Sequence, residues 1–129
     1  MASNIPLSCA DITDREIRAA SDALLGEQLA LGSWTKRFET AVAKHAECNF
    51  GIATNSSHSA MHITLEAFGV GLGDEVAIPS FAFPATASTI LQLGATPIFI
   101  DCDVRTMNLD KTDLAKKITD KTKAIIVTH

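Results

Sequence analysis

Long apolar runs, basic clusters and a signal sequence are all missing from this chain of 129 residues. No uninterrupted apolar stretch approaches the length of a membrane-spanning helix. The formal net charge is −4 and no Lys/Arg cluster is present, which argues against a nucleic-acid-binding surface. The first residues have neither a basic flank nor the apolar core of a signal peptide. We therefore expect a protein that binds neither nucleic acid nor membrane.

Paired cysteines are missing as well. Cys9, Cys48 and Cys102 are odd in number, lie far apart and match no zinc-binding spacing. This usage suits a reducing compartment, so we expect a cytoplasmic protein without a metal site. Internal repeats and low-complexity linkers are absent too. Apolar residues nevertheless make up 47 % of the chain, which is typical of a folded α/β interior.

Capping signals and apolar periodicity predict helices that alternate with strands. A capping box at Thr13–Glu16 predicts a helix to about Gly26, and Ser33 opens a second helix. A third helix should bury Met61, Leu65 and Phe68 and end at Gly69. Two more helices are expected, one from Pro84 to Gly94 and a short one capped by Asp110. Strands are expected at residues 50–54, 75–78, 96–100 and 123–127.

This alternation predicts an α/β fold with a mainly parallel sheet and helices on both faces, which makes three layers (α/β/α). Ligands in such folds bind beyond the carboxyl ends of the strands. Those ends fall at residues 55–59, 79–83, 101–103 and 128–129. His129 follows an apolar strand directly, without a helix to cover it, so we expect a truncated chain.

The polar turn Thr54–Ser59 joins the first expected strand to a helix. A helix N-terminus offers free N–H groups and a partial positive charge, so the turn is a candidate phosphate site. The alternative is that Asn55 or Ser56 simply caps the helix. The turn alone favours capping. A second segment, Pro79–Thr86, adds Phe83 to the predicted ligand face, where its ring suits stacking on a planar ligand.

Two further motifs have competing interpretations. Asp101-Cys102-Asp103 has the spacing of a metal-binding D-x-D motif, but tripeptides of this kind are common by chance. The glycines at 69, 71 and 73 follow a helix and precede a strand. A dinucleotide-binding loop has the opposite order, so these glycines are interpreted as a helix stop and a turn.

Four segments in this order resemble the DegT/DnrJ/EryC1/StrS family of sugar aminotransferases, which use pyridoxal 5′-phosphate (PLP). They are 5–13 (IPLSCADIT), 69–86 (GVGLGDEVAIPSFAFPAT), 94–101 (GATPIFID) and 122–129 (TKAIIVTH). Together they cover nearly the whole chain. The resemblance implies the type I fold of PLP-dependent transferases. Residues 1–32 would be an N-terminal segment and helix, and residues 33–129 an incomplete, N-terminal part of the large PLP-binding domain.

The resemblance also implies site residues. Ser57, His58 and Ser59 would bind the PLP phosphate, and Phe83 would stack on the pyridine ring. The family usually has Gly-Thr where this chain has Ser57-His58. Glycine lets the backbone approach a phosphate closely, whereas Ser57 adds a Cβ there. His58 retains the capacity to donate a hydrogen bond.

The same resemblance places the family's Schiff-base lysine and ring-binding aspartate beyond residue 129, so no catalytic residue is expected here. The implied parent enzyme is a homodimeric, PLP-dependent aminotransferase of nucleotide-linked keto sugars, with glutamate or glutamine as amino donor. The chain alone should be inactive. Two alternatives remain: a PLP-dependent sugar dehydratase with histidine in place of the lysine, and a non-catalytic regulatory relative.

Overall fold

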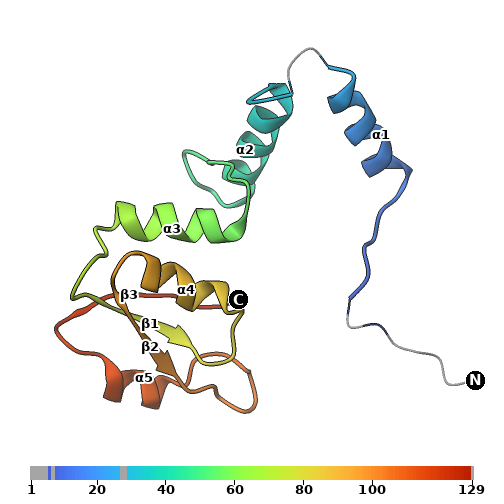
Figure 1. Ribbon diagram of the computed structural model, residues 1–129. Helices are drawn as coiled ribbons and strands as arrows, with labels where there is room; N and C mark the ends of the chain where they lie inside the picture. The colour runs from blue at the N-terminus through green and yellow to red at the C-terminus, as the bar shows by residue number, and fades with distance from the viewer. Residues whose placement is uncertain (1–5, 7, 27–28, 129) are drawn as a thin grey trace, which may run out of the picture. The chain divides into compact units, whose positions relative to one another are not determined.

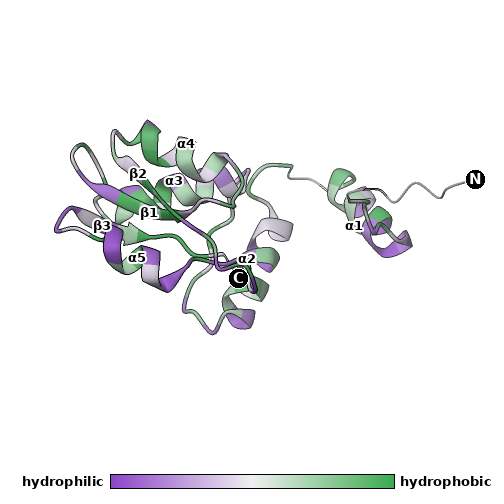
Figure 2. Cartoon of the chain, turned by 90° about the horizontal axis from the view of Figure 1, so that it is seen from below, coloured by the Kyte–Doolittle hydropathy of each residue, from purple (hydrophilic) through white to green (hydrophobic). Residues whose placement is uncertain are grey.

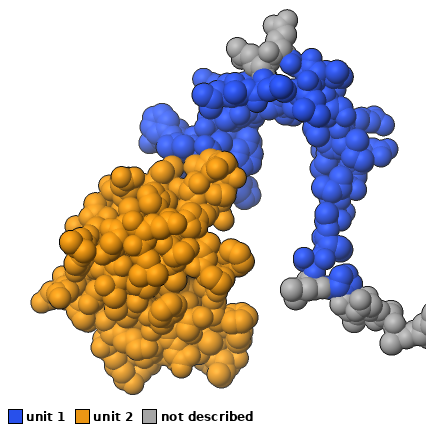
Figure 3. Space-filling model, in the orientation of Figure 1, with its two compact units in different colours: residues 1–53 blue, residues 54–129 orange. Residues whose placement is uncertain are grey.

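The computed structural model describes residues 6, 8–26 and 29–128 of the chain. The chain divides into two compact units, residues 1–53 and residues 54–129 (Figure 3). None of the helices in the described ranges combines the length and the apolar character needed to cross a membrane. His129, where the sequence indicated an unfinished sheet, lies outside the described residues.

Unit 1 contains two helices that begin where the sequence predicts. Helix α1 spans Asp14–Leu24 and helix α2 spans Ser33–His45. The capping box before α1 is present, because the Thr13 side chain accepts from Arg15 N and Glu16 Oε2 accepts from Thr13 N at 2.8 Å. Helix α2 follows Gly32, whose backbone is extended and which supplies no capping side chain.

The strand expected at residues 50–54 is wrong, because the structure has no regular secondary structure there. Phe50 and Ile52 are 85 % and 77 % exposed. A strand needs a neighbour for its backbone N–H and C=O groups. The backbone N–H of Ala53 instead donates to Glu39 Oε1 in α2 at 2.9 Å. The apolar composition of residues 50–54 indicated a buried strand, but these residues pair with no strand in the described part of the chain.

Unit 2 is a three-layer α/β/α structure, as predicted. Its elements in chain order are α3 (Ser57–Ala67), β1 (Glu75–Pro79), α4 (Ala85–Gln92), β2 (Thr96–Ile100), α5 (Lys111–Lys117) and β3 (Thr122–Ile125). The three strands are parallel in the order β2-β1-β3, with Ala77 of β1 opposite Ile98 and Ile125. Helices α3 and α4 lie over one face of the sheet and α5 over the other (Figure 1).

The core of unit 2 lies between β1 and helices α3 and α4. Val76, Ile78 and Ile90 are at most 1 % exposed, and Leu65 of α3 is 4 % exposed. Burying such a side chain contributes about 1.5–3 kcal/mol to folding. Helix α5 is largely hydrophilic (Figure 2) and buries no residue. The sheet is therefore well covered on the side of α3 and α4.

Several element ends, and the burial of one side chain, differ from the sequence expectations. Strand β3 ends at Ile125, two residues before the expected end. Helix α4 starts after Pro84, which is its N-cap, and ends at Gln92, although Gly94 does take the left-handed conformation (φ +76°) that stops a helix. Phe68 is 65 % exposed rather than buried. Its ring lies in a groove between α3 and β3.

The glycine-rich segment after α3 is a helix stop and a turn, as predicted. Gly69 and Gly73 have φ angles of +72° and +92°, which favour glycine. Asp74 Oδ2 accepts a hydrogen bond from Gly71 N at 2.9 Å and so closes the turn before β1. These contacts lie within the turn itself, so we interpret the segment as the connection between α3 and β1.

Candidate functional site

The turn before α3 is held by hydrogen bonds among its own side chains. Ser56 is the N-cap of α3, and its Oγ accepts from Ser59 N at 3.1 Å. Ser59 Oγ donates to Asn55 Oδ1 at 2.6 Å, and Thr54 Oγ1 donates to the Ser56 carbonyl at 2.8 Å. The capping interpretation of this turn is therefore correct for Ser56. The Ser59 N–H, which the sequence offered as a free donor, is used by the cap.

Two backbone donors remain at the start of α3. The N–H groups of Ser57 and His58 have no hydrogen-bond acceptor among the described residues. Ser57 is exposed and His58 is half-buried. The first N–H groups of a helix lack intrahelical partners and coincide with the positive end of its dipole. These two N–H groups can therefore bind an anion, although no lysine or arginine lies in the turn.

Phe83 lies on the loop between β1 and α4, one residue before the N-cap of α4. Its side chain is 80 % exposed, so its ring is open to a ligand. The loop is ordered by the Thr86 N–H, which donates to the Phe83 carbonyl at 3.1 Å. Helices α3 and α4 both start at the end of unit 2 where β1 terminates (Figure 1). Phe83 and the Ser57–Ser59 turn therefore share the ligand-binding end of the sheet.

The His58 side chain does not extend from the turn toward solvent. Its Nε2 lies 2.9 Å from Gln92 Oε1, and its Nδ1 lies 3.4 Å from Thr89 Oγ1, both in α4. The imidazole is therefore occupied, and the backbone N–H of His58 is the group left for an anion. Gln92 and Thr89 were missed at the sequence level because they lie 34 and 31 residues away from His58. Only the packing of α3 on α4 reveals them.

The carboxylates of the D-x-D motif are engaged with the backbone of their own loop. Asp101 Oδ1 accepts from Cys102 N at 2.8 Å. Asp103 Oδ1 accepts from Arg105 N at 2.8 Å and from Thr106 N at 3.2 Å. These two hydrogen bonds hold the pKa of Asp103 below its ordinary value, and the bond from Arg105 N has the larger effect. Within the described residues no three His, Cys, Asp or Glu side chains are grouped as metal ligands.

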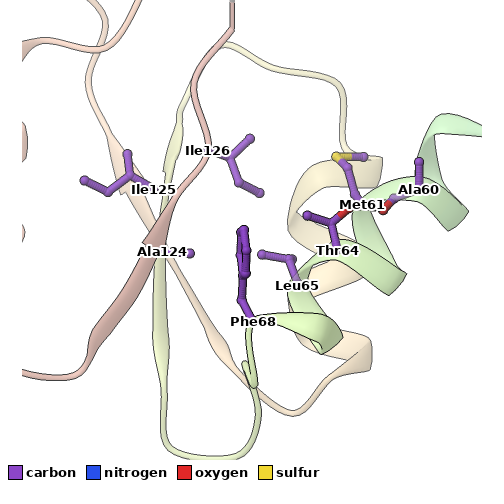
Figure 4. A pocket seen from close by; sticks show the side chains of 8 residues that line it. All are labelled: Ala60, Met61, Thr64, Leu65, Phe68, Ala124, Ile125 and Ile126. Atoms are coloured by element: carbon purple, nitrogen blue, oxygen red, sulfur yellow. Dashed lines mark hydrogen bonds between the residues drawn. The ribbon is translucent and has the colours of Figure 1, made fainter. Parts of the chain in front are cut away.

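An apolar groove of about 330 Å³ runs between α3 and β3 (Figure 4). Phe68 projects into this groove from the C-terminal end of α3 and faces Ala124 and Ile126 of the β3 region. Thr64 supplies the one hydroxyl among the lining side chains. A groove with so few polar groups does not suit a phosphate. The groove is therefore not part of the anion-binding turn at Ser57 and His58, which offers backbone N–H donors.

None of the seven lysines of the chain falls within the turn at residues 54–59 or the loop at residues 80–84. They are Lys36 and Lys44 in α2, Lys111, Lys116 and Lys117 in α5, and Lys121 and Lys123 at the start of β3. Lys117 Nζ is already bound, donating to the Phe99 carbonyl at 2.8 Å and pairing with Asp113 Oδ2 at 2.8 Å. The site within these residues thus offers N–H donors and an aromatic ring, but no amine.

Residues 10–129 match the sequence profile of the DegT/DnrJ/EryC1/StrS aminotransferase family. The match covers most of the chain, so the chain belongs to this family. A GDP-perosamine synthase from Caulobacter vibrioides is 41 % identical over 100 residues, which cover 78 % of this chain and 27 % of the synthase. The family resemblance drawn from the sequence is confirmed.

Two solved structures are similar in fold. An aminotransferase from Psychrobacter cryohalolentis has a TM-score of 0.85 at 35 % identity, covering 95 % of this chain and 32 % of the other. The GDP-4-keto-6-deoxy-D-mannose-3-dehydratase of E. coli, with bound hydrated PLP, has a TM-score of 0.86 at 28 % identity. The match covers 96 % of this chain and 33 % of the dehydratase chain. The chain has the fold of the type I PLP-dependent transferases and spans about a third of these proteins' length.

Proposed function

We propose that this chain is part of a PLP-dependent aminotransferase that acts on a nucleotide-linked keto sugar, with glutamate or glutamine as amino donor. The observation that carries the proposal is the family match over residues 10–129. The relatives named above include a synthase of a GDP-linked sugar and an aminotransferase. Residues 33–129 would then be the part of the large domain that contributes to the PLP site.

The residues present fit the phosphate and ring of PLP. Ser57 and His58 would bind the phosphate through their free N–H groups, with Ser59 completing the turn, and the exposed ring of Phe83 would stack on the pyridine. When bound, PLP supplies an electron sink for chemistry at the amine-bearing carbon. This chain's contribution is to hold and orient the cofactor. We propose that the lysine and aspartate which complete the site belong to parts of the enzyme outside these 129 residues.

Oligomeric state and compartment belong to the same proposal. We propose a homodimer, because the family resemblance implies one. We propose a cytoplasmic enzyme because Cys9, Cys48 and Cys102 are free thiols within the described part of the chain.

A sugar dehydratase is the second candidate. It is favoured by the similarity to the E. coli dehydratase, whose TM-score of 0.86 is as high as that of the Psychrobacter aminotransferase, 0.85. The two reactions share the phosphate and ring contacts that these residues can make. They differ in the residue at the cofactor-binding lysine position, where the dehydratase would have histidine. The coding sequence beyond residue 129 distinguishes them directly.

The test is an assay of the whole enzyme with PLP, glutamate or glutamine, and a panel of nucleotide-linked keto sugars. Mass spectrometry of the sugar is the readout. An aminotransferase replaces the keto oxygen by an amine and turns the donor into its keto acid. Loss of water from the sugar without amine incorporation would support the dehydratase. Absence of any PLP-dependent change over the panel would contradict both candidates.

A further inference from the structure

The side chain of His58 joins helix α3 to helix α4. His58 is the second residue of α3, and its partners Thr89 and Gln92 lie in the last two turns of α4. A carbonyl oxygen only accepts, so the Nε2 that lies 2.9 Å from Gln92 Oε1 carries the hydrogen. The side chain therefore forms a directed cross-link from the first turn of α3 to α4.

The other ring nitrogen faces a fixed group. Thr89 is fully buried, and its hydroxyl donates to the Ala85 carbonyl at 2.8 Å. His58 Nδ1 lies 3.4 Å from that hydroxyl oxygen. With its hydrogen on Nε2, the ring has an acceptor at Nδ1, and the Thr89 hydroxyl already donates its hydrogen to Ala85. The Nδ1 contact is therefore packing against a buried side chain, and the hydrogen bond to Gln92 is what orients the imidazole. The ring therefore does not serve as a mobile donor to an anion in the turn.

The hydrogen bonds among Thr54, Asn55, Ser56 and Ser59 hold the first turn of α3 locally, but they do not connect it to α4 or to the sheet. The one buried residue of α3 is Leu65, which lies two turns further along, toward the C-terminal end. Helix α4, in contrast, is anchored in the core by Ile90, which is fully buried against β1 residues. Because α4 is fixed on the sheet, a hydrogen bond from His58 to α4 also fixes the start of α3 relative to the sheet. The N–H groups of Ser57 and His58 lie in that same turn.

We propose that His58 is a positioning residue: it holds the N-terminal turn of α3 against α4 through its hydrogen bond to Gln92, so that the backbone N–H groups of Ser57 and His58, and not the imidazole, bind a phosphate group. The phosphate half of this proposal rests on the proposed function. The cross-link itself rests on the contacts of His58 alone. The two halves are measured separately.

The experiment compares six forms of the full 129-residue chain: the unchanged chain, His58→Ala, His58→Gln, His58→Asn, His62→Ala and the double variant His58→Ala/Gln92→Ala. His62 is half-buried in the same helix and makes no side-chain hydrogen bond among the described residues, so it is the matched control. A glutamine amide can donate from the position of Nε2, whereas an asparagine amide reaches only the position of Nδ1. Amide exchange at Ala60, the first N–H of α3 that donates to a backbone carbonyl, reports on the cross-link. A titration with inorganic phosphate reports on the donors.

We expect His58→Ala to accelerate exchange at Ala60 and to weaken phosphate binding, each by about fivefold, which is the effect of one lost hydrogen bond. His58→Gln should restore both values, His58→Asn should not, and His62→Ala should change neither. Adding Gln92→Ala to His58→Ala should cause no further loss. Unchanged Ala60 exchange in His58→Ala, or equal effects of Gln and Asn, would overturn the cross-link. If the unchanged chain binds no phosphate, the proposed phosphate site fails, and the Ala60 exchange rates still decide whether His58 positions the turn.

Discussion

The backbone N–H of Ala53 donates a hydrogen bond to Glu39 Oε1 of α2 over 2.9 Å. Close by, Gly51 passes the backbone of Glu39 so tightly that a Cβ at position 51 would collide with the Glu39 carbonyl oxygen. These two contacts keep residues 51–53 beside α2. They explain why an apolar segment with the composition of a strand is not one here.

Gly51→Ala should therefore destabilise the packing of this segment on α2, by about 1–3 kcal/mol, because the added methyl meets backbone that cannot move alone. The expected result is faster amide exchange at Ala53 and a lower unfolding midpoint. Gly71→Ala is the matched control, because a Cβ there meets nothing within 4 Å and no positive φ is recorded for Gly71. Equal effects of the two substitutions would contradict the tight packing at Gly51.

The attachment of α5 to the end of β2 should depend on pH. Asp113 Oδ2 accepts from Asp101 N at 2.7 Å and pairs with Lys117 Nζ at 2.8 Å. The Asp101 bond first, and the Lys117 contact second, hold the pKa of Asp113 below its ordinary value. Such a carboxylate stabilises the fold at pH above its ordinary pKa, and this contribution is lost as the pH falls through the lowered pKa.

The unfolding midpoint should thus decrease below about pH 4 in the unchanged chain, more steeply than in Asp113→Asn. Asp120→Asn, at an exposed position outside α5, is the control and should keep the steep profile. A profile of Asp113→Asn that is as steep as that of the unchanged chain would show that other carboxylates cause the acid sensitivity.

Local signals in the sequence predicted most of the helix starts. Thr13 and Asp110 cap α1 and α5 as expected, because capping depends on neighbours within three residues. The expected burial of Phe68 and the expected strand at residues 50–54 were wrong. Phe68 lines an open groove beside β3, and Ala53 bonds to Glu39 of α2 instead of to a strand. The His58–Gln92 contact spans 34 residues and left no local signal. Predicting it would have required the packing of α3 on α4.

Replacing Ser57 by glycine should strengthen phosphate binding, because removal of the Cβ lets an anion approach the N–H groups more closely. The same change should lower stability by about 0.5 kcal/mol through backbone entropy. The measurements are a phosphate titration and thermal unfolding of the Ser57→Gly chain. Ala60→Gly, in the same helix but away from the two free donors, should lower stability without a gain in affinity. A weaker affinity in Ser57→Gly would show that the serine side chain itself contacts the anion.

Treatment of the chain with PLP and then borohydride should label its lysines weakly and non-stoichiometrically. None of the seven lysines lies in the turn before α3 or in the loop that carries Phe83. Intact-mass measurement and peptide mapping give the extent and position of labelling. One stoichiometric adduct, abolished by a single Lys→Ala change, would contradict the proposal that the cofactor-binding lysine lies outside these residues.

The most direct test of the proposed cofactor site is an amide-resolved NMR titration of the ¹⁵N-labelled chain with PLP, inorganic phosphate and pyridoxal, which lacks the phosphate. PLP and inorganic phosphate should both shift the amide signals of Ser57 and His58, because these two N–H groups are the free donors at the start of α3. Pyridoxal should leave both signals unchanged. Shifts confined to other segments, or equal shifts with pyridoxal, would contradict a phosphate site at this turn.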